Sequence, residues 1–171
     1  MKRTAQWLLL ALVAASLAQA AWQHARLPER VATHFDLAGQ ANGWMARDTH
    51  TAFHVGTVLF ITGLMFGLAR FLAKLPDQLI NLPHREHWLA PERRAATFEW
   101  MAGLLLGLGC IAQIVFLFIF QQVYEANLMP EPKLPLKAGP FFIGLFGFIA
   151  GLVALLMFRF RLPWREPGNR R

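Results

Sequence analysis

The sequence predicts an all-α membrane protein with four transmembrane helices, both termini in the cytoplasm, and a small folded outer loop between the first two helices. Of its 171 residues, 56% are hydrophobic and 16% are charged, which is too apolar for an ordinary soluble domain. Four apolar runs reach the roughly 20 helical residues that a hydrocarbon core about 30 Å thick requires. Basic residues gather in the segments on one side of these runs, as in cytoplasmic loops.

The first apolar run, residues 4–23, contains no charged residue. Trp7 and Trp22 lie near its ends, where amphipathic rings favour the membrane interface. The two basic residues before the run and the Ala-Gln-Ala sequence at 18–20 also match a cleavable secretory signal. Cleavage is therefore an alternative, but the bounding tryptophans favour a retained transmembrane helix.

The other three apolar runs are residues 52–69, 100–124 and 138–158. Arg70 follows the first of them, where a long side chain can reach lipid headgroups. The runs divide the chain into a first region, a second pair of helices and a tail. These parts are residues 1–99, with an outer loop at 24–51 and an inner loop at 70–99; residues 100–161, with an outer loop at 125–138; and a basic cytoplasmic tail at 162–171.

The distribution of Lys and Arg sets the predicted orientation, because basic residues are retained on the cytoplasmic side. With the N terminus inside, the outer loops hold Arg26, Arg30, Arg47, Lys133 and Lys137. The remaining basic residues are all inside: Lys2, Arg3, Arg70, Lys74, Arg85, Arg93, Arg94, Arg159, Arg161, Arg165, Arg170 and Arg171. We therefore expect both termini in the cytoplasm.

The net charge of +7 would suggest a nucleic-acid partner if the protein were soluble. Here the basic residues flank apolar runs, so topology and attraction to anionic lipid headgroups explain them. We expect the lipid bilayer to be a partner and nucleic acid not to be one.

Small residues within the runs predict how the helices associate, since membrane helices approach closely at glycine. Glycine pairs four residues apart occur in three of the runs, at 63 and 67, 103 and 107, and 147 and 151. We expect these seams to pack the helices of one chain together, with a homo-oligomer as the alternative. Gln113 is the clearest polar group deep in a run and predicts an interhelical hydrogen bond, while Cys110 is expected to serve packing.

The outer loop, residues 24–51, is rich in turn-forming and aromatic residues. Pro28 followed by Glu29 is typical of a first helical turn, and Gly39 would end that short helix with a positive φ. Asn42-Gly43 is a strong turn signal. The loop is thus expected to form a cap in which His34, Phe35 and Trp44 can meet.

Four histidines, at positions 24, 34, 50 and 54, lie in or beside this loop. His50 and His54 would be one helical turn apart if the second helix starts early, and Asp36 or Asp48 would add an oxygen ligand. Metal sensing is therefore an alternative, although no HExxH or paired CxxC motif frames a site. The expectation remains that the chain binds neither metal nor cofactor.

The inner loop carries NLPHREHWLAPERR at residues 81–94. Pro91 followed by Glu92 again predicts a helix start, so the third helix should begin well before Trp100. A headgroup-level turn anchored by Trp88 and a docking site for a partner are the two interpretations of this segment. The chain has no nucleophile elbow, phosphate-binding glycine loop or carboxylate pair on an apolar face, so we expect no enzymatic activity.

The stretch LPERVATHFDLAGQANGWMAR, residues 27–47, resembles the domain of unknown function 1648 family of bacterial membrane proteins, which includes immunity proteins against the sporulation-delay toxin. The residues that fit its pattern are Pro28, His34, Phe35, Gly39, Gly43 and Trp44. Ala32, Asn42 and Arg47 depart from the family's proline, aspartate and lysine. The segment at 81–94 is similar to one found in some of these proteins, with Asn81, Pro83, Trp88, Pro91 and Glu92 in matching places.

This resemblance implies a multi-pass protein of the bacterial inner membrane, related to toxin immunity or signalling and without enzymatic activity. We expect a ligand, a peptide or a membrane-protein partner to be recognised through His34, Phe35, Gly39, Gly43 and Trp44, with Asn81, Pro83 and Trp88 as further candidates. A small oligomeric transport or export component, assembled through the glycine seams, is the alternative from another functional class.

Overall fold

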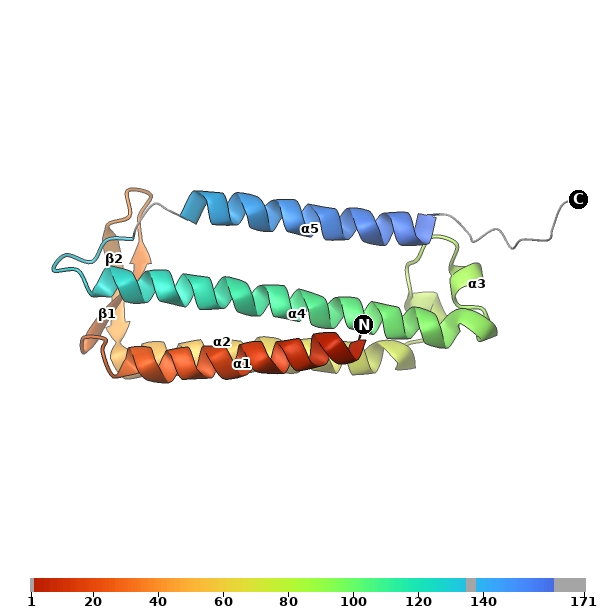
Figure 1. The fold of residues 1–171 in the computed structure, drawn as a ribbon, viewed down its shortest axis with the longest axis horizontal. Coiled ribbons are helices and arrows are strands. Elements are labelled where there is room, and N and C mark those ends of the chain that lie inside the picture. The colour runs from red at the N-terminus through yellow and green to blue at the C-terminus, as the bar shows by residue number, and fades with distance from the viewer. Residues whose placement is uncertain (1, 135–137, 162–171) are drawn as a thin grey trace, which may run out of the picture.

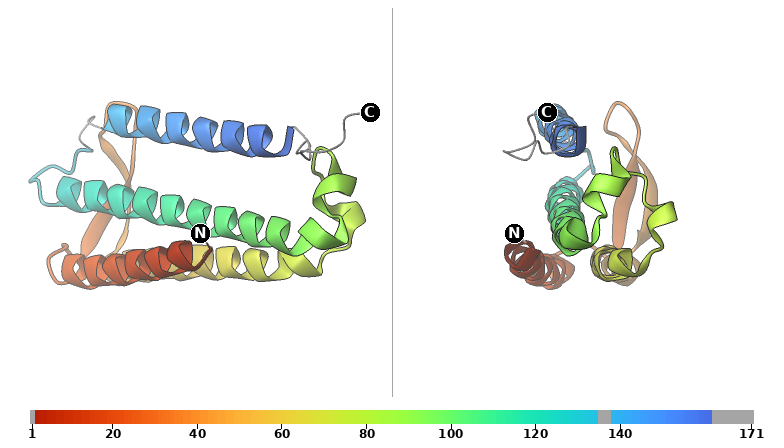
Figure 2. Two further views of the ribbon diagram at one scale, coloured as in Figure 1. Left: turned by 45° about the vertical axis from the view of Figure 1, so that its right-hand side comes forward. Right: turned by 90° about the vertical axis from the view of Figure 1, so that its right-hand side faces the viewer.

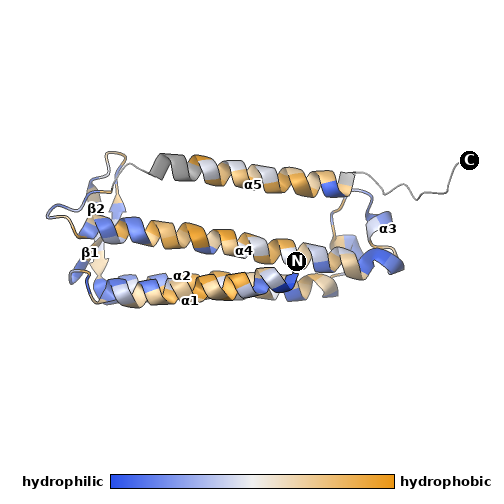
Figure 3. Ribbon diagram, in the orientation of Figure 1, coloured by the Kyte–Doolittle hydropathy of each residue, from blue (hydrophilic) through white to orange (hydrophobic). Residues whose placement is uncertain are grey.

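Four long helices make up most of the chain (Figure 1). The computed structural model describes residues 2–134 and 138–161; the predicted basic tail at 162–171 and part of the predicted loop at 125–138 lie outside the described residues. The four helices are α1 (Lys2–His24), α2 (Arg47–Phe71), α4 (Pro91–Asn127) and α5 (Ala138–Arg161). Each is long and apolar enough to cross a membrane, and Figure 3 shows hydrophobic residues along their middle parts and hydrophilic residues toward both ends of the bundle.

Helices α1, α2 and α4 pack against one another, whereas α5 lies on the far side of α4 (Figures 1 and 2). Leu9 of α1 and Leu106 of α4 are fully buried in the central apolar cluster, together with Cys110. Gly109 makes the closest approach, because a Cβ there would lie 3.0 Å from Met65 Cγ and 3.2 Å from Leu9 Cδ2. Cys110 serves packing, as predicted.

A polar contact joins the same three helices within this apolar core. Gln113 of α4 donates through Nε2 to the Val58 carbonyl and to Thr62 Oγ1, both at 3.0 Å, and accepts from Ser16 Oγ at 3.5 Å. The predicted interhelical hydrogen bond of Gln113 is therefore confirmed, and it reaches two helices. Such bonds stabilise helix association because hydrocarbon offers a lone amide no other partner.

The predicted glycine seams at 63/67 and 147/151 do not pack against other described residues. A Cβ added at Gly63, Gly67, Gly107, Gly147 or Gly151 would meet nothing within 4 Å in the described part of the chain, whereas Gly103 is buried in α4. The close approach occurs instead at Gly109, which belongs to none of the predicted pairs. Spacing alone places two glycines on one helix face, but the tertiary arrangement decides whether another helix covers that face.

Helix α5 is anchored at its C-terminal end. The ring of Phe160, 1% exposed, lies edge-on to Trp88 and Trp100 with centroids 5.3 Å away in each case. The Arg159 guanidinium lies 4.3 Å from the centre of the Trp88 ring. Further along, an apolar groove of about 590 Å³ separates α5 from α1 and α4, with Leu8, Gly107, Cys110, Phe148 and Leu152 among its lining residues.

The segment between α2 and α4 lies at one end of the bundle (Figure 1) and contains three short helices. These are η1 (Leu72–Lys74), η2 (Asp77–Leu79) and α3 (Arg85–Trp88). Arg94 donates to Asp77 Oδ1 at 3.1 and 3.2 Å, and Thr97 Oγ1 donates to the Trp88 carbonyl. α4 begins at Pro91, with the proline in its first turn, as its sequence predicted.

At the opposite end, two antiparallel strands, β1 (Arg30–Phe35) and β2 (Ala41–Ala46), connect α1 to α2. The prediction of an all-α fold is wrong in this respect: the chain is mostly helical and carries one β-hairpin. The hairpin crosses the ends of the helices and reaches from α1 and α2 toward the level of α5 (Figure 1).

Candidate functional site: the hairpin cap

Residues 25–46, here called the hairpin cap, form the most elaborate structure outside the helices. Val31 pairs with Met45, Ala32 with Trp44 and His34 with Gly43, with irregularities on either side of His34. The cap thus brings His34, Phe35, Gly39, Gly43 and Trp44 into one hairpin.

The turn of the hairpin lies at Asp36–Gly39 rather than at Asn42-Gly43. Asp36 Oδ1 accepts from the N–H groups of Ala38 and Gln40, at 2.9 and 2.8 Å, and this side-chain bonding is typical of turns that aspartate begins. Gly39 has φ +79°, so its predicted positive φ is confirmed. Asn42 and Gly43 lie inside β2, and the predicted reversal directly before Trp44 is wrong.

The predicted short helix after Pro28 is also wrong, since residues from Arg30 are extended. The sequence offered a local helix start, but Val31 and Thr33 are β-branched and fit a strand. Tertiary contacts add to this preference. Leu27, Val31 and Phe35 pack with Val123 and Tyr124 of α4 in a separate apolar cluster, and an extended chain places Val31 and Phe35 on one face.

Asn127, the last residue of α4, holds β1 in place. Its Oδ1 accepts from the Ala32 N–H at 2.7 Å, and its Nδ2 donates to the carbonyls of Ala32 and Val123, both at 2.8 Å. All three bonds are buried or nearly so, because Asn127 is 7% and Ala32 is 0% exposed. The sequence analysis missed Asn127; a polar amide ending an apolar helix is the only signal that it offered.

Gly39 has a second structural role at the tip of the hairpin. Its carbonyl accepts from the Leu134 N–H at 2.8 Å, and a Cβ at Gly39 would lie 2.7 Å from the Leu134 carbonyl oxygen. Lys133 forms an isolated antiparallel bridge with Gln40. The connection that follows α4 therefore lies directly against the hairpin, and only glycine fits there.

The other face of the cap is open. Trp44 is 48% exposed and Leu37, at the tip, is fully exposed, and His34 is exposed as well. The His34 ring lies over Gly43, where an added Cβ would be 3.0 to 3.2 Å from its Cβ, Nδ1 and Cγ. His34 and Trp44 are thus presented to the surroundings, while Phe35 packs inward.

The two histidines of the suggested metal site, His50 and His54, both lie against the ring of Phe120. His50 and His54 are buried in α2, and the His54 ring stacks on Phe120 with centroids 3.6 Å apart. His24 instead bonds Thr51 Oγ1 at 2.9 Å. Among the described residues no group of three or more His, Cys, Asp or Glu side chains is placed to hold a metal ion.

A line of glutamines runs beneath the cap between α1 and α4. Gln121 Oε1 accepts from Gln19 Nε2 and Gln23 Nε2 at 3.2 and 3.1 Å, and Gln121 Nε2 donates to Glu125. Gln19 and Gln23 are four residues apart and therefore share a helix face, a signal that the sequence analysis did not use. These bonds tie the end of α1, where the hairpin begins, to α4.

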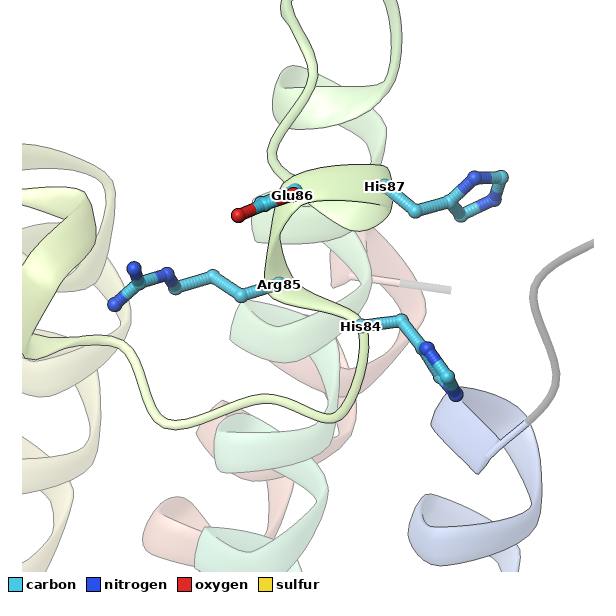
Figure 4. Close-up of a pocket in the computed structure, with 4 residues that line it drawn as sticks. All are labelled: His84, Arg85, Glu86 and His87. Atoms are coloured by element: carbon cyan, nitrogen blue, oxygen red, sulfur yellow. The ribbon is translucent and has the colours of Figure 1, made fainter.

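The second set of candidate residues lies at the other end of the bundle. Asn81 and Pro83 are exposed, whereas Trp88 is 5% exposed and packs under Phe160. A pocket of about 420 Å³ opens beside them, lined by residues 84–87; Figure 4 shows the His84 and His87 side chains pointing away from Arg85. The structure does not bring this set together with the cap.

Comparison with known proteins gives one result. No curated protein and no solved structure matches the chain. The family model of a domain of unknown function, DUF1648, matches residues 9–56, which contain most of α1, the whole hairpin cap and the start of α2. The segment at 81–94 lies outside this match. The resemblance of the cap to this family is therefore confirmed over residues 9–56.

Proposed function

We propose that this protein is a non-enzymatic, multi-pass protein of the bacterial inner membrane whose hairpin cap recognises a peptide or membrane-protein partner on the outer side. The observation that carries the proposal is the division of the cap into two faces. Leu27, Val31 and Phe35 account for its packing, so the exposed Trp44 and Leu37 are not needed for the core.

A rigid support makes such exposed residues suitable for binding, because binding residues gather on loops that a scaffold positions. Asn127 bonds Ala32 of β1, and Leu134 bonds Gly39 at the turn. The cap therefore presents Trp44 at a defined place with little ordering cost on binding.

The proposed orientation follows from charge. Lys2 and Arg3 begin α1 and Lys74 and Arg85 lie near the opposite end from the cap, which would be the cytoplasmic end by the retention of basic residues. Cysteine accessibility tests this placement in a background in which the single cysteine is replaced by Cys110→Ala. Trp44→Cys should react with an impermeant maleimide in intact cells, and Arg85→Cys should react only after lysis. The reverse pattern contradicts the proposal.

Recognition itself is tested by placing a photo-crosslinking amino acid at Trp44 in living cells, with Leu128 as the control position. Leu128 is 56% exposed and follows the end of α4, outside the hairpin. We expect a discrete adduct from position 44 that position 128 does not give. Capture of lipid or of the protein's own chain alone contradicts recognition. If the partner is a toxin, deleting the gene also sensitises cells to a secreted membrane-active peptide.

A small oligomeric transport component is the second candidate, and the uncovered glycine faces favour it. A Cβ at Gly63 or Gly67 of α2 would meet no described residue within 4 Å, so another copy can approach there. Flux of solutes into liposomes holding the purified protein, lost in Gly63→Leu, would support transport. Impermeable liposomes would leave partner recognition as the function.

A further inference from the structure

We propose that the open edge of β2 accepts an extended peptide as an added strand, with its main chain paired to the N–H and C=O of Trp44. This inference rests on the proposed function and names the class of partner: a segment of polypeptide bound in β conformation. The juxtaposition that carries it is Asn127 on one edge of the hairpin and Trp44 on the other.

The pairing at Ala32 shows which way the backbone of β2 faces. Asn127 takes both the N–H and the C=O of Ala32, so these groups point away from β2. In an antiparallel pair, two opposite residues either bond each other or both face outward. Trp44 is the residue opposite Ala32, and its N–H and C=O therefore point away from β1.

The next pairs along the ladder agree with this assignment. Outward and mutually bonded pairs alternate, so Val31 and Met45 bond each other and Arg30 and Ala46 face outward. The pair after that should bond again, and the Arg47 N–H does donate to the Glu29 carbonyl at 2.9 Å. The Asn127 bonds at Ala32 and the bond between Arg47 and Glu29 therefore give the same register for β2 from Trp44 to its C-terminal end.

No backbone hydrogen bond from another described segment reaches Trp44. Among the named helices and strands, β2 contacts chiefly β1 and the start of α2, which follows it in the chain. Asn127 thus supplies, on one edge, a side-chain donor and acceptor in place of a strand. The matching donor and acceptor of Trp44 are open to an incoming one.

Backbone bonds at Gly39 and Gln40, just before β2, show that another segment of main chain can pair there. Gln40, just before β2, has its carbonyl bonded by the Asp36 N–H on the β1 side, while the Gly39 carbonyl accepts from Leu134 on the other side. Lys133 bridges Gln40 in antiparallel fashion. A short piece of backbone therefore pairs with the chain just before β2, and an added peptide would pair farther along, at Trp44.

Exposed sheet edges bind extended peptides through alternating main-chain hydrogen bonds, with side-chain contacts adding specificity. The half-exposed Trp44 ring supplies an apolar contact for a side chain of the peptide on the same face. The ligand class is an extended peptide with an unsubstituted amide at the position opposite Trp44 and an apolar side chain beside the indole.

The test uses the full-length protein in lipid nanodiscs and a random octapeptide library displayed on phage. Selected octapeptides are synthesised, and their affinities are measured by fluorescence anisotropy. Each is also made with a single N-methyl group at successive positions, which removes one main-chain donor at a time. We expect methylation to weaken binding at alternate positions only, since every second amide of a strand faces its neighbour.

The protein side is tested by replacing the amide of Trp44 with an ester, through suppression with the hydroxy-acid analogue of tryptophan. This change removes the N–H and keeps the indole. We expect affinity to fall about tenfold, as for one lost hydrogen bond, with the thermal unfolding midpoint unchanged. The matched ester at Met45 removes a ladder bond, and it should lower that midpoint instead.

The outcomes separate this inference from the proposed function. If selected octapeptides lose binding in Trp44→Ala but not in the Trp44 ester, and methylation shows no alternation, the cap binds through side chains and the added strand is overturned. If the library gives no octapeptide that binds, or β2 edges pair only between two copies of the chain, the inference is also overturned. Failure of photo-crosslinking at Trp44 in cells bears on the proposed function alone.

Discussion

Asn127 bonds both backbone groups of Ala32, at 2.7 Å to the N–H and 2.8 Å to the carbonyl, although 95 residues separate them in the chain. This one side chain couples the end of α4 to the first strand of the hairpin cap. It satisfies a backbone pair that would otherwise be buried without partners, and it sets the direction in which the opposite strand faces.

Asn127→Ala should destabilise the protein by roughly 2 kcal/mol or more, because it leaves two buried backbone groups of Ala32 unsatisfied. Thermal unfolding in detergent, followed by tryptophan fluorescence, measures this. Leu128→Ala is the control, since Leu128 is adjacent and 56% exposed; it should change stability by no more than about 0.5 kcal/mol. Equal effects of the two substitutions would contradict the role assigned to Asn127.

Gly39→Ala should lower stability by roughly 2 kcal/mol, through the cost of a side chain at positive φ and the contact of 2.7 Å with the Leu134 carbonyl oxygen. The neighbouring Ala38→Gly serves as a control for a change in the same turn without a clash. Amide exchange at Leu134 provides a local readout, because its N–H bonds Gly39. Unchanged protection of Leu134 in Gly39→Ala would argue against this contact.

Gly109 and Gly107 offer a matched pair within α4. Gly109→Ala brings a methyl group within 3.0 Å of Met65 and 3.2 Å of Leu9, and overpacking of this kind costs about 1–3 kcal/mol. The methyl group of Gly107→Ala would meet no described residue within 4 Å, and this change should leave stability unchanged or raise it, since alanine favours helix. Denaturation of both variants in mixed micelles shows which one is less stable. Loss of stability in Gly107→Ala alone would contradict the packing of α4 described above.

Gln113→Leu should weaken the contact between α4 and α2 by roughly 1 kcal/mol, the usual size for a hydrogen bond between membrane helices. The substitution removes bonds to Val58, Thr62 and Ser16 and replaces the amide with an apolar side chain of similar size. Ile114→Leu, at a 47% exposed neighbouring position, is the control. The free energies of unfolding of the two variants in micelles should differ by that amount. Equal free energies would show that Gln113 has no part in helix association.

Local chemistry was enough to predict several elements. Four apolar runs coincide with helices α1, α2, α4 and α5, because the length and composition needed to cross a bilayer are properties of a segment alone. The start of α4 at Pro91 and the positive φ of Gly39 were also predicted from local chemistry. A proline ring restricts the backbone, and the missing side chain of glycine frees it, wherever these residues occur. The resemblance of residues 27–47 to the family whose model matches residues 9–56 was likewise evident from the sequence.

The cap itself was decided by tertiary structure. Pro28 and Glu29 favour a helix locally, yet the following residues form β1 because β2, Asn127 and the cluster around Val123 all bind them in extended form. Long-range pairing of this kind outweighs local propensity. The same cause separates Trp44, which faces outward, from Phe35, which packs inward, although the sequence grouped them.

What the sequence determined by itself is therefore the set of apolar helices and the places where single residues constrain the backbone. What only the tertiary structure decided, among the residues it describes, is which groups have partners: Ala32 of β1 is bonded by Asn127, no backbone bond from another segment reaches Trp44 of β2, and the glycines of α2 and α5 meet no neighbour within 4 Å. The partners of a surface come from residues that are distant in the chain. The type of a residue determines which bonds its groups can make, but it does not determine which residue the fold places beside them.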